Sequence, residues 1–239
     1  MVTSLALCFD APMQSWGTRS PGTLRDTAAE PTKSGVVGLL AAALGVHRDD
    51  HDAIADLAAL TLAVRVDREG IPERDYHTTQ NVPTTLGKGH RTVVSERYYL
   101  ADALFLVILE GHPELLQRLN HTIDSPRWPV FFGRRAFVPA RPLLTRTGLT
   151  HQPALRLLHT HPWLENDPDV RKSESAKTER VPLRTIIDCP ATTPGAVPRR
   201  DHPISFTHGD RRHGLRHVLP ATTPLTDPMI SDGDQAPCS

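Results

Sequence analysis

The stretch SGVVGLLAAALG, residues 34–45, is a mainly apolar segment with a regular pattern. Apolar residues recur in it every three or four positions, which is the spacing of one buried helix face. The side chains that share this face are those of Val36, Leu39, Leu40, Ala43 and Leu44. Ser34 can cap the start of the helix and Gly45 can end it. The stretch therefore predicts a helix with one face in a core.

Strand and helix patterns flank this helix along the chain. Short apolar or alternating runs predict three strands, at residues 3–9, 60–67 and 103–109. Two more helices are predicted, at residues 53–60 and 114–123. The order strand, helix, strand, strand, helix makes up most of a ferredoxin-like unit. We therefore expect an α+β protein with a ferredoxin-like first domain over residues 1–145.

A long polar segment, residues 68–100, separates the second strand from the third. Loops in compact domains are usually shorter than about 12 to 15 residues unless they have a function. This segment has a glycine-rich tip at residues 87–89, aromatic residues at both ends and polar side chains between, which is typical of a hairpin-like arm. Bases stack on aromatic rings, and arginines bind phosphates. The composition therefore favours a single-stranded RNA ligand over an ordinary solvated loop.

The pattern after residue 145 is less regular. Proline is frequent, clear helices are absent, and only residues 184–188 and 203–206 resemble short strands. We expect residues 146–219 to form an irregular β-rich part packed on the first domain. Residues 220–239 have the composition of a disordered tail, with many proline, threonine and aspartate residues.

Composition limits the class of protein. The chain of 239 residues has 27 basic and 27 acidic residues, so an anionic partner has to meet a local basic patch. Only four of the basic residues are lysine; arginine suits bidentate phosphate contacts, although a GC-rich genome would give the same bias. The three cysteines have no CxxC spacing, which fits a reducing cytoplasm. No run approaches the roughly 20 apolar residues of a membrane span, so we expect a cytoplasmic protein without membrane contact.

Motifs for catalysis and metal binding are weak. PTKSG, residues 31–35, resembles the end of a nucleotide-binding P-loop but lacks its glycines. A helix N-terminus beside Lys33 still suits one phosphate; alternatively, Lys33 is a solvated surface residue and Ser34 a simple cap. His47 and His51 have i, i+4 spacing after a helix-ending glycine, without a third ligand. We expect no metal, no cofactor and no catalytic residue.

Two further segments are candidates for RNA contact. PMQSWG, residues 12–17, follows the first strand and combines an amide, a hydroxyl and an indole. Its amide and hydroxyl can hydrogen-bond a nucleotide, and Trp16 either stacks on a base or caps the core. In FFGRR, residues 131–135, a glycine that can bend the loop precedes two adjacent cations, Arg134 and Arg135.

Four motifs occur in an order that resembles the CasD family, the subtype I-E members of the fifth Cas protein family in the CRISPR Cascade complex. They are APMQSWG at 11–17, PTKSGVVGLLAAALGVHRDD at 31–50, RDYHT at 74–78 and FFGRR at 131–135. The resemblance is dense from residue 3 to about residue 145 and looser to residue 219. The last twenty residues have no counterpart.

The resemblance implies an RNA-binding scaffold rather than an enzyme. It implies an RRM-related, RAMP-type ferredoxin-like core with an inserted thumb hairpin, which binds the 5′ handle of CRISPR RNA (crRNA). The implied partners are a CasC-type backbone subunit and a CasA-type large subunit, with target DNA contacted only indirectly. The residues expected to face RNA are Met13, Gln14, Ser15, Trp16, Arg25, Lys33, Ser34, Arg74, Tyr76, His77, Lys88, Arg91, Arg97, Arg134 and Arg135.

A second hypothesis is a metal-independent endoribonuclease that processes CRISPR repeat RNA, as the subtype I-C relatives do. Tyr76, His77 and Lys88 would then supply the acid–base and charge-stabilising groups. Adjacent tyrosine and histidine residues are common and unspecific, so the non-catalytic scaffold is the favoured function.

Overall fold

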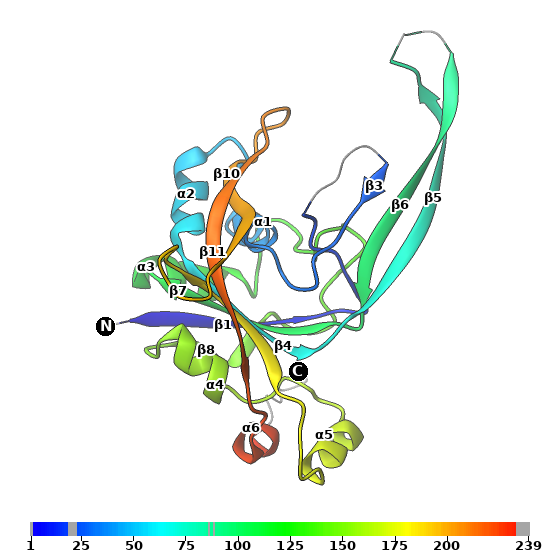
Figure 1. Ribbon diagram of the computed structural model, residues 1–239. Coiled ribbons are helices and arrows are strands. Elements are labelled where there is room, and N and C mark those ends of the chain that lie inside the picture. Colours follow the sequence, from blue (N-terminus) through cyan, green and yellow to red (C-terminus); the bar gives the residue numbers. More distant parts are fainter. Residues whose placement is uncertain (1, 19–22, 86, 88, 233–239) are drawn as a thin grey trace.

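The computed structural model describes residues 2–18, 23–85, 87 and 89–232 (Figure 1). The strands are β1 (Thr3–Asp10), β2 (Met13–Gln14), β3 (Leu24–Arg25), β4 (Thr61–Arg68), β5 (Ile71–Pro83), β6 (His90–Ala101), β7 (Leu104–Gly111), β8 (Leu144–Thr150), β9 (Leu183–Cys189), β10 (Val197–Ser205) and β11 (Arg212–Thr223). The helices are α1 (Lys33–Leu44), α2 (His51–Ala59), α3 (Pro113–Thr122), α4 (Ala154–Thr160), α5 (Pro168–Ser175) and α6 (Asp227–Ser231). Within the described residues the large sheet has the order β10-β11-β9-β4-β7-β1-β8, and a small sheet contains β2, β3, β5 and β6.

Helices cover both faces of the large sheet, with α1, α2 and α3 on one side and α4 on the other (Figure 1). Successive side chains of a strand point to opposite faces. Leu5, Leu7 and Phe9 of β1 therefore join the apolar cluster under α1, whereas Ala6 and Cys8 join the cluster under α4. Because both faces are buried, β1 and β7 are apolar at nearly every position instead of alternating. This burial explains the continuous apolar runs in the sequence.

The elements predicted before residue 124 are confirmed, with ends that differ by one or two residues. The predicted strands are β1, β4 and β7, and the predicted helices are α1, α2 and α3. β1 and β7 lie side by side in antiparallel pairing, with β4 beside β7 and β8 beside β1. The first half of the chain thus builds the centre of the large sheet.

The start of α1 differs in detail from the expectation. Thr32, rather than Ser34, caps the helix, because its Oγ1 accepts a hydrogen bond from the Gly35 amide at 3.3 Å. A Cβ at Gly35 would lie 2.8 Å from the Trp16 ring, so the helix begins in close contact with that indole. Gly45 ends the helix as expected, with a left-handed φ of +73°.

The polar segment forms a long antiparallel hairpin of β5 and β6 that projects away from the large sheet (Figure 1). The register pairs Ile71 with Ala101 at the base and Pro83 with His90 near the tip. β5 is exposed along nearly its whole length. The extended pairing satisfies backbone donors and acceptors of a segment that has too few apolar residues to build its own core.

Residues 146–219 are β-rich as expected, and the predicted strands at 184–188 and 203–206 overlap β9 and the end of β10. The expectation that this part is irregular and separate from the first domain is wrong in two respects. Helices α4 and α5 occur where clear helices were thought absent, and β9, β10 and β11 extend the large sheet. The domain boundary expected at residue 145 falls inside β8, which pairs with β1, so both parts share one sheet. The helices were missed because seven or eight residues show too little periodicity.

The expectation of a disordered tail is wrong for residues 220–232. The end of β11 pairs with β9, from Pro220 opposite Ile186 to Thr223 opposite Leu183. Met229 of α6 is then buried with its neighbours in a small apolar cluster. Residues 233–239 lie outside the described residues. None of the helices described is long and apolar enough to cross a bilayer.

Candidate nucleic-acid interface

Trp16 lies in the core. Its ring stacks on Phe9 with the centroids 5.6 Å apart, and Phe132 lies 4.8 Å from Phe9. The Gln14 amide donates to the carbonyl oxygens of Phe9 and Ala103 at 3.1 and 2.8 Å, and its Oε1 accepts from the Trp16 indole at 3.2 Å. Trp16 is 1% exposed and Gln14 0%. Contrary to expectation, the Gln14 side chain is not available to RNA; for Trp16, the alternative that the indole caps the core holds. Both side chains fix the loop through buried hydrogen bonds.

Ser15 and Gly133 fix the FFGRR segment against the strand β6. The Ser15 amide donates to the Phe132 carbonyl oxygen at 3.0 Å, and its hydroxyl donates to the Tyr98 carbonyl oxygen at 3.3 Å. Gly133 has a φ of +88°, and a Cβ there would lie 1.9 Å from the Ser15 carbonyl oxygen. Only glycine fits this position. The contact brings the following residue, Arg134, beside β6.

Arg134 belongs to a group of three arginines, which we call the first arginine cluster (Arg25, Arg97 and Arg134). Its guanidinium donates to the Tyr98 carbonyl oxygen at 2.7 Å and lies over the Phe137 ring, 5.2 Å from the centroid. Arg25 and Arg97 are direct partners in the β3–β6 pairing. Burial, followed by the charge of Arg97, lowers the pKa of Arg134. Like charges opposite each other in a sheet are destabilising, so this cluster favours an anionic ligand.

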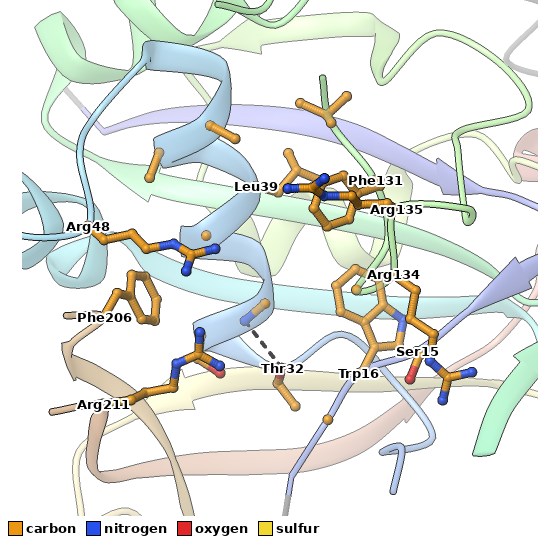
Figure 2. Close-up of a pocket in the computed structure, with 18 of the residues that line it drawn as sticks. Ser15, Trp16, Thr32, Leu39, Arg48, Phe131, Arg134, Arg135, Phe206 and Arg211 are labelled. Carbon is orange, nitrogen blue, oxygen red and sulfur yellow. Dashed lines mark hydrogen bonds between the residues drawn. The ribbon is translucent and has the colours of Figure 1, made fainter. Parts of the chain in front are cut away.

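The first arginine cluster lines an open cleft of about 1350 Å³ over α1, which we call the basic cleft (Figure 2). Its other boundaries are the loop after β2, the segment 128–138 and the turn between β10 and β11. Asp26 is the only acidic residue among the described lining residues. Six arginines line the cleft: Arg25, Arg48, Arg97, Arg134, Arg135 and Arg211. Because the whole chain has no net charge, this positive charge is local and suits a ligand with several phosphates.

Lys33 is turned away from the basic cleft. Its ammonium donates to the Leu60 carbonyl oxygen at 2.8 Å and pairs with Asp188 at 2.5 Å, and the residue is 6% exposed. Its backbone amide, at the start of α1, donates to the Asp201 carboxylate at 2.9 Å. A carboxylate therefore occupies the position expected for a phosphate. Both earlier alternatives for Lys33 are contradicted, whereas Ser34 does line the cleft.

Arg216 extends this buried ion pair into a network. It pairs with Asp188 of β9 and, at 2.6 and 2.8 Å, with Asp201 of β10. Although burial opposes it, hydrogen bonding to Arg216 lowers the pKa of Asp201. The network joins the start of α1 to β9, β10 and β11, so the C-terminal hairpin is fixed against the helix that forms the floor of the cleft.

The comparison with protein families identifies the chain. The family model described as CRISPR-associated protein (Cas_Cas5) matches residues 4–219. The chain belongs to the Cas5 family. Its resemblance to the CasD branch, inferred from four sequence motifs, agrees with a relative in Escherichia coli (strain K12), "CRISPR system Cascade subunit CasD". This Cas5-family chain is 33% identical to it over 176 residues, covering 68% of this chain and 79% of the relative.

Two solved structures resemble this Cas5-family chain over almost its whole length. The first is titled "Crystal structure of Cas protein"; it is 34% identical, with a TM-score of 0.70, and the match covers 92% of this chain and 95% of that one. The second is a chain of a "CRISPR RNA-guided surveillance complex"; it is 28% identical, with a TM-score of 0.77 and 96% of both chains covered.

Other residues expected to bind RNA lie on the hairpin and do not line the basic cleft of this Cas5-family chain. Arg74 and Arg91 are exposed on β5 and β6, and Arg74 pairs with Glu96 at 3.4 Å. Met13, in β2, is exposed at the base of the hairpin, where it pairs with Ala101. These residues are spread from the base of the hairpin to near its tip, apart from the residues that line the cleft. The expected tip residue Lys88 lies outside the described residues.

The geometry of the hairpin does not support acid–base chemistry by Tyr76 and His77. They are consecutive residues of an exposed strand, so their side chains point to opposite faces and cannot act on the same bond. Among the described residues, no group of three His, Cys, Asp or Glu side chains is placed to hold a metal ion.

Sequence analysis missed the wall of the basic cleft opposite the first arginine cluster. This second wall consists of Arg48, Phe206, Arg211 and His213. Arg48 belongs to a stretch that was considered only for its histidines. Phe206 and Arg211 lie in the turn between β10 and β11, and His213 lies in β11. No local pattern links segments so far apart in the chain. Their proximity results from the pairing of β10 with β11 and from the contact of β10 with α1.

Proposed function

We propose that this Cas5-family chain is a non-catalytic subunit of a Cascade-type CRISPR surveillance complex, in which it holds the 5′ handle of crRNA for antiviral defence. The observation that carries the proposal is the first arginine cluster. Arg25 and Arg97 are direct neighbours in two strands, and Arg134 is beside them. Asp75, opposite Arg97 in the β5–β6 pairing, offsets part of this positive charge, and an RNA backbone supplies further negative charge. The similarity to the Escherichia coli Cascade subunit supports the same function.

We interpret the centre of the large sheet as the ferredoxin-like, RRM-related core of the RAMP proteins. Two observations support this interpretation. The strands β4, β7, β1 and β8 are neighbours in the sheet in that order. Along the chain, α1 and α2 lie between β1 and β4, and α3 lies between β7 and β8. The β5–β6 hairpin, inserted between the second and third strands of that core, is then the thumb.

Single-stranded RNA fits the basic cleft better than a duplex. The cleft contains aromatic surface next to its arginines, including the exposed Trp128 and the half-buried Phe131. Unpaired bases can stack on such rings, whereas the bases of a duplex are already stacked on one another. Ser15, Trp16, Ser34 and Arg135 are the other expected RNA-facing residues that border the cleft, and of these Trp16 is almost completely buried.

The proposed partners follow from the family. In a Cascade-type complex the chain contacts a CasC-type backbone subunit and a CasA-type large subunit, in the cytoplasm, and meets target DNA only indirectly. The exposed hairpin residues Met13, Arg74, Tyr76, His77 and Arg91 are available to the RNA or to these protein partners. No cofactor is required for this role.

The salt dependence of RNA affinity tests the proposal. Three to five phosphate contacts by arginine give a slope of about −2 to −3.5 for log K against log salt, at about −0.7 per contact. Arg25→Gln with Arg97→Gln should make the slope less negative by about 1.4. The matched control, Arg118→Gln with Arg156→Gln, removes two exposed arginines that do not line the cleft. A wild-type slope near zero would exclude the proposal.

Incubation with CRISPR repeat RNA in EDTA tests the endoribonuclease alternative. The non-catalytic subunit leaves the RNA intact at every time point. Metal-independent cleavage that is lost in His77→Ala would establish the nuclease instead.

A further inference from the structure

The second wall of the basic cleft faces the first arginine cluster across α1. Figure 2 shows Arg48, Phe206 and Arg211 on one side of the helix, and Ser15, Trp16 and Arg134 on the other. Arg48 and Arg211 lie on either side of the Phe206 ring (Figure 2). The second wall thus places an aromatic ring between two cations, at a distance along the cleft from the first arginine cluster.

The two cations of the second wall have no negative partner. Both are exposed, and neither forms an ion pair with a described residue. Asp210 is adjacent to Arg211 in the chain, but it pairs with Arg212 at 3.1 Å. Arg48 likewise stands between His47 and Asp49, which pair with each other at 3.2 Å. The acidic neighbours are therefore engaged elsewhere.

Phe206 is held firmly in the wall. The ring is half-buried, packs against the main apolar cluster and meets the His213 ring edge-on with the centroids 6.5 Å apart. The buried pairs of Arg216 with Asp188 and Asp201 fix β10 and β11 behind it. A ring fixed in this way presents a stacking surface without a further loss of side-chain freedom on binding.

We infer that the second wall is a nucleotide-binding subsite, at which one base of a single-stranded RNA stacks on Phe206 while Arg48 and Arg211 bind the phosphates on either side of it. This inference rests on the proposed function, because it assigns a second point of contact to the same RNA. The first arginine cluster binds one part of the strand, and the second wall binds a nucleotide further along it.

The spacing of the two contact points gives a length-dependent test. Binding is measured with fluorescein-labelled oligoadenylates of about 4 and about 16 nucleotides, the range of site sizes found for single-strand-binding folds. A long strand has enough phosphates and bases to contact the first arginine cluster and the second wall together, whereas a short strand has fewer. The full-length chain is used throughout, with Arg118→Gln plus Arg156→Gln as the control. Both arginines are exposed and neither lines the cleft.

Arg48→Gln with Arg211→Gln should weaken binding of the long RNA at least about tenfold and make its salt slope less negative by about 1.4. Phe206→Leu should weaken it at least about fivefold without changing the slope, because a stacked base carries no charge there. Both variants should weaken binding of the short RNA less than binding of the long RNA. The fluorescent base 2-aminopurine is placed at successive positions of the long RNA. Its fluorescence should be quenched by the wild type at the one position that stacks on Phe206, and should recover with Phe206→Leu.

Two results overturn the inference, and they differ from each other. If Arg48→Gln with Arg211→Gln matches the control on both RNAs, while Arg25→Gln with Arg97→Gln still weakens binding, the subsite is wrong and the proposed function stands. If the wild type binds neither RNA, both are wrong. The arginine variants alter exposed side chains, so this result does not depend on whether Phe206→Leu folds.

Discussion

Replacing Lys33 by methionine removes a buried ammonium group while keeping the length of the side chain. The substitution breaks the hydrogen bond to the Leu60 carbonyl oxygen at 2.8 Å and the ion pair with Asp188 at 2.5 Å. Removing one partner of a buried pair costs about 3–5 kcal/mol. Asp188 keeps its pair with Arg216 and accepts a hydrogen bond from the Leu62 amide at 3.0 Å, so the lower end applies. At about 2–4 °C per kcal/mol for a chain of this size, Tm should fall by about 6–12 °C.

Thermal unfolding followed by circular dichroism measures this effect. Lys177→Met is the control, because it removes a half-exposed ion pair with Glu174, and such pairs are worth about 0–1 kcal/mol. RNA affinity is measured against salt concentration at a temperature at which both variants are folded. Because Lys33 does not line the cleft, the slope of log K against log salt for Lys33→Met should equal that of the wild type. The reasoning is refuted if Lys33→Met leaves Tm unchanged and makes the slope less negative by about 0.7, the effect of a lost phosphate ligand.

Three other outcomes are expected. Gly133→Ala should destabilise the fold by more than about 2 kcal/mol in denaturant unfolding. The residue has a positive φ, and the added Cβ would lie 1.9 Å from the Ser15 carbonyl oxygen. A variant as stable as the wild type would contradict this contact. Arg134→Ala with Arg135→Ala should weaken RNA binding at least about tenfold in fluorescence anisotropy, whereas His77→Ala should cost less; the reverse order would count against the basic cleft. Burial and a neighbouring arginine lower the pKa of His213, so the unfolded chain binds more protons and stability should decrease as the pH drops through about 6.5. His213→Gln should reduce the decrease in Tm between about pH 7 and about pH 5. If the variant has the same Tm profile against pH as the wild type, the pKa of His213 is not lowered in the folded protein.

The elements of the central sheet could be predicted because their signals are local. β1 and β7 are short runs of apolar residues, and α1 has a helical apolar face with a glycine at its end. The C-terminal elements lack such signals. The segment 220–223 becomes a strand only because β9, distant in the chain, pairs with it. Composition cannot reveal a partner of this kind.

The residues of the candidate site also fall into two groups, those that could be predicted from local sequence and those that could not. The family, the order of the central elements and the presence of Arg134 after a glycine could be predicted from the amino-acid sequence, since each depends on neighbouring residues. Which polar side chains remain available to a ligand depends on the folded chain. Gln14 and Lys33 are buried by hydrogen bonds to distant segments, whereas Arg48 and Arg211 are brought to one cleft without carboxylate partners. The physical reason is that periodicity is a property of neighbouring residues, while burial and charge pairing depend on residues that meet only after the chain has folded.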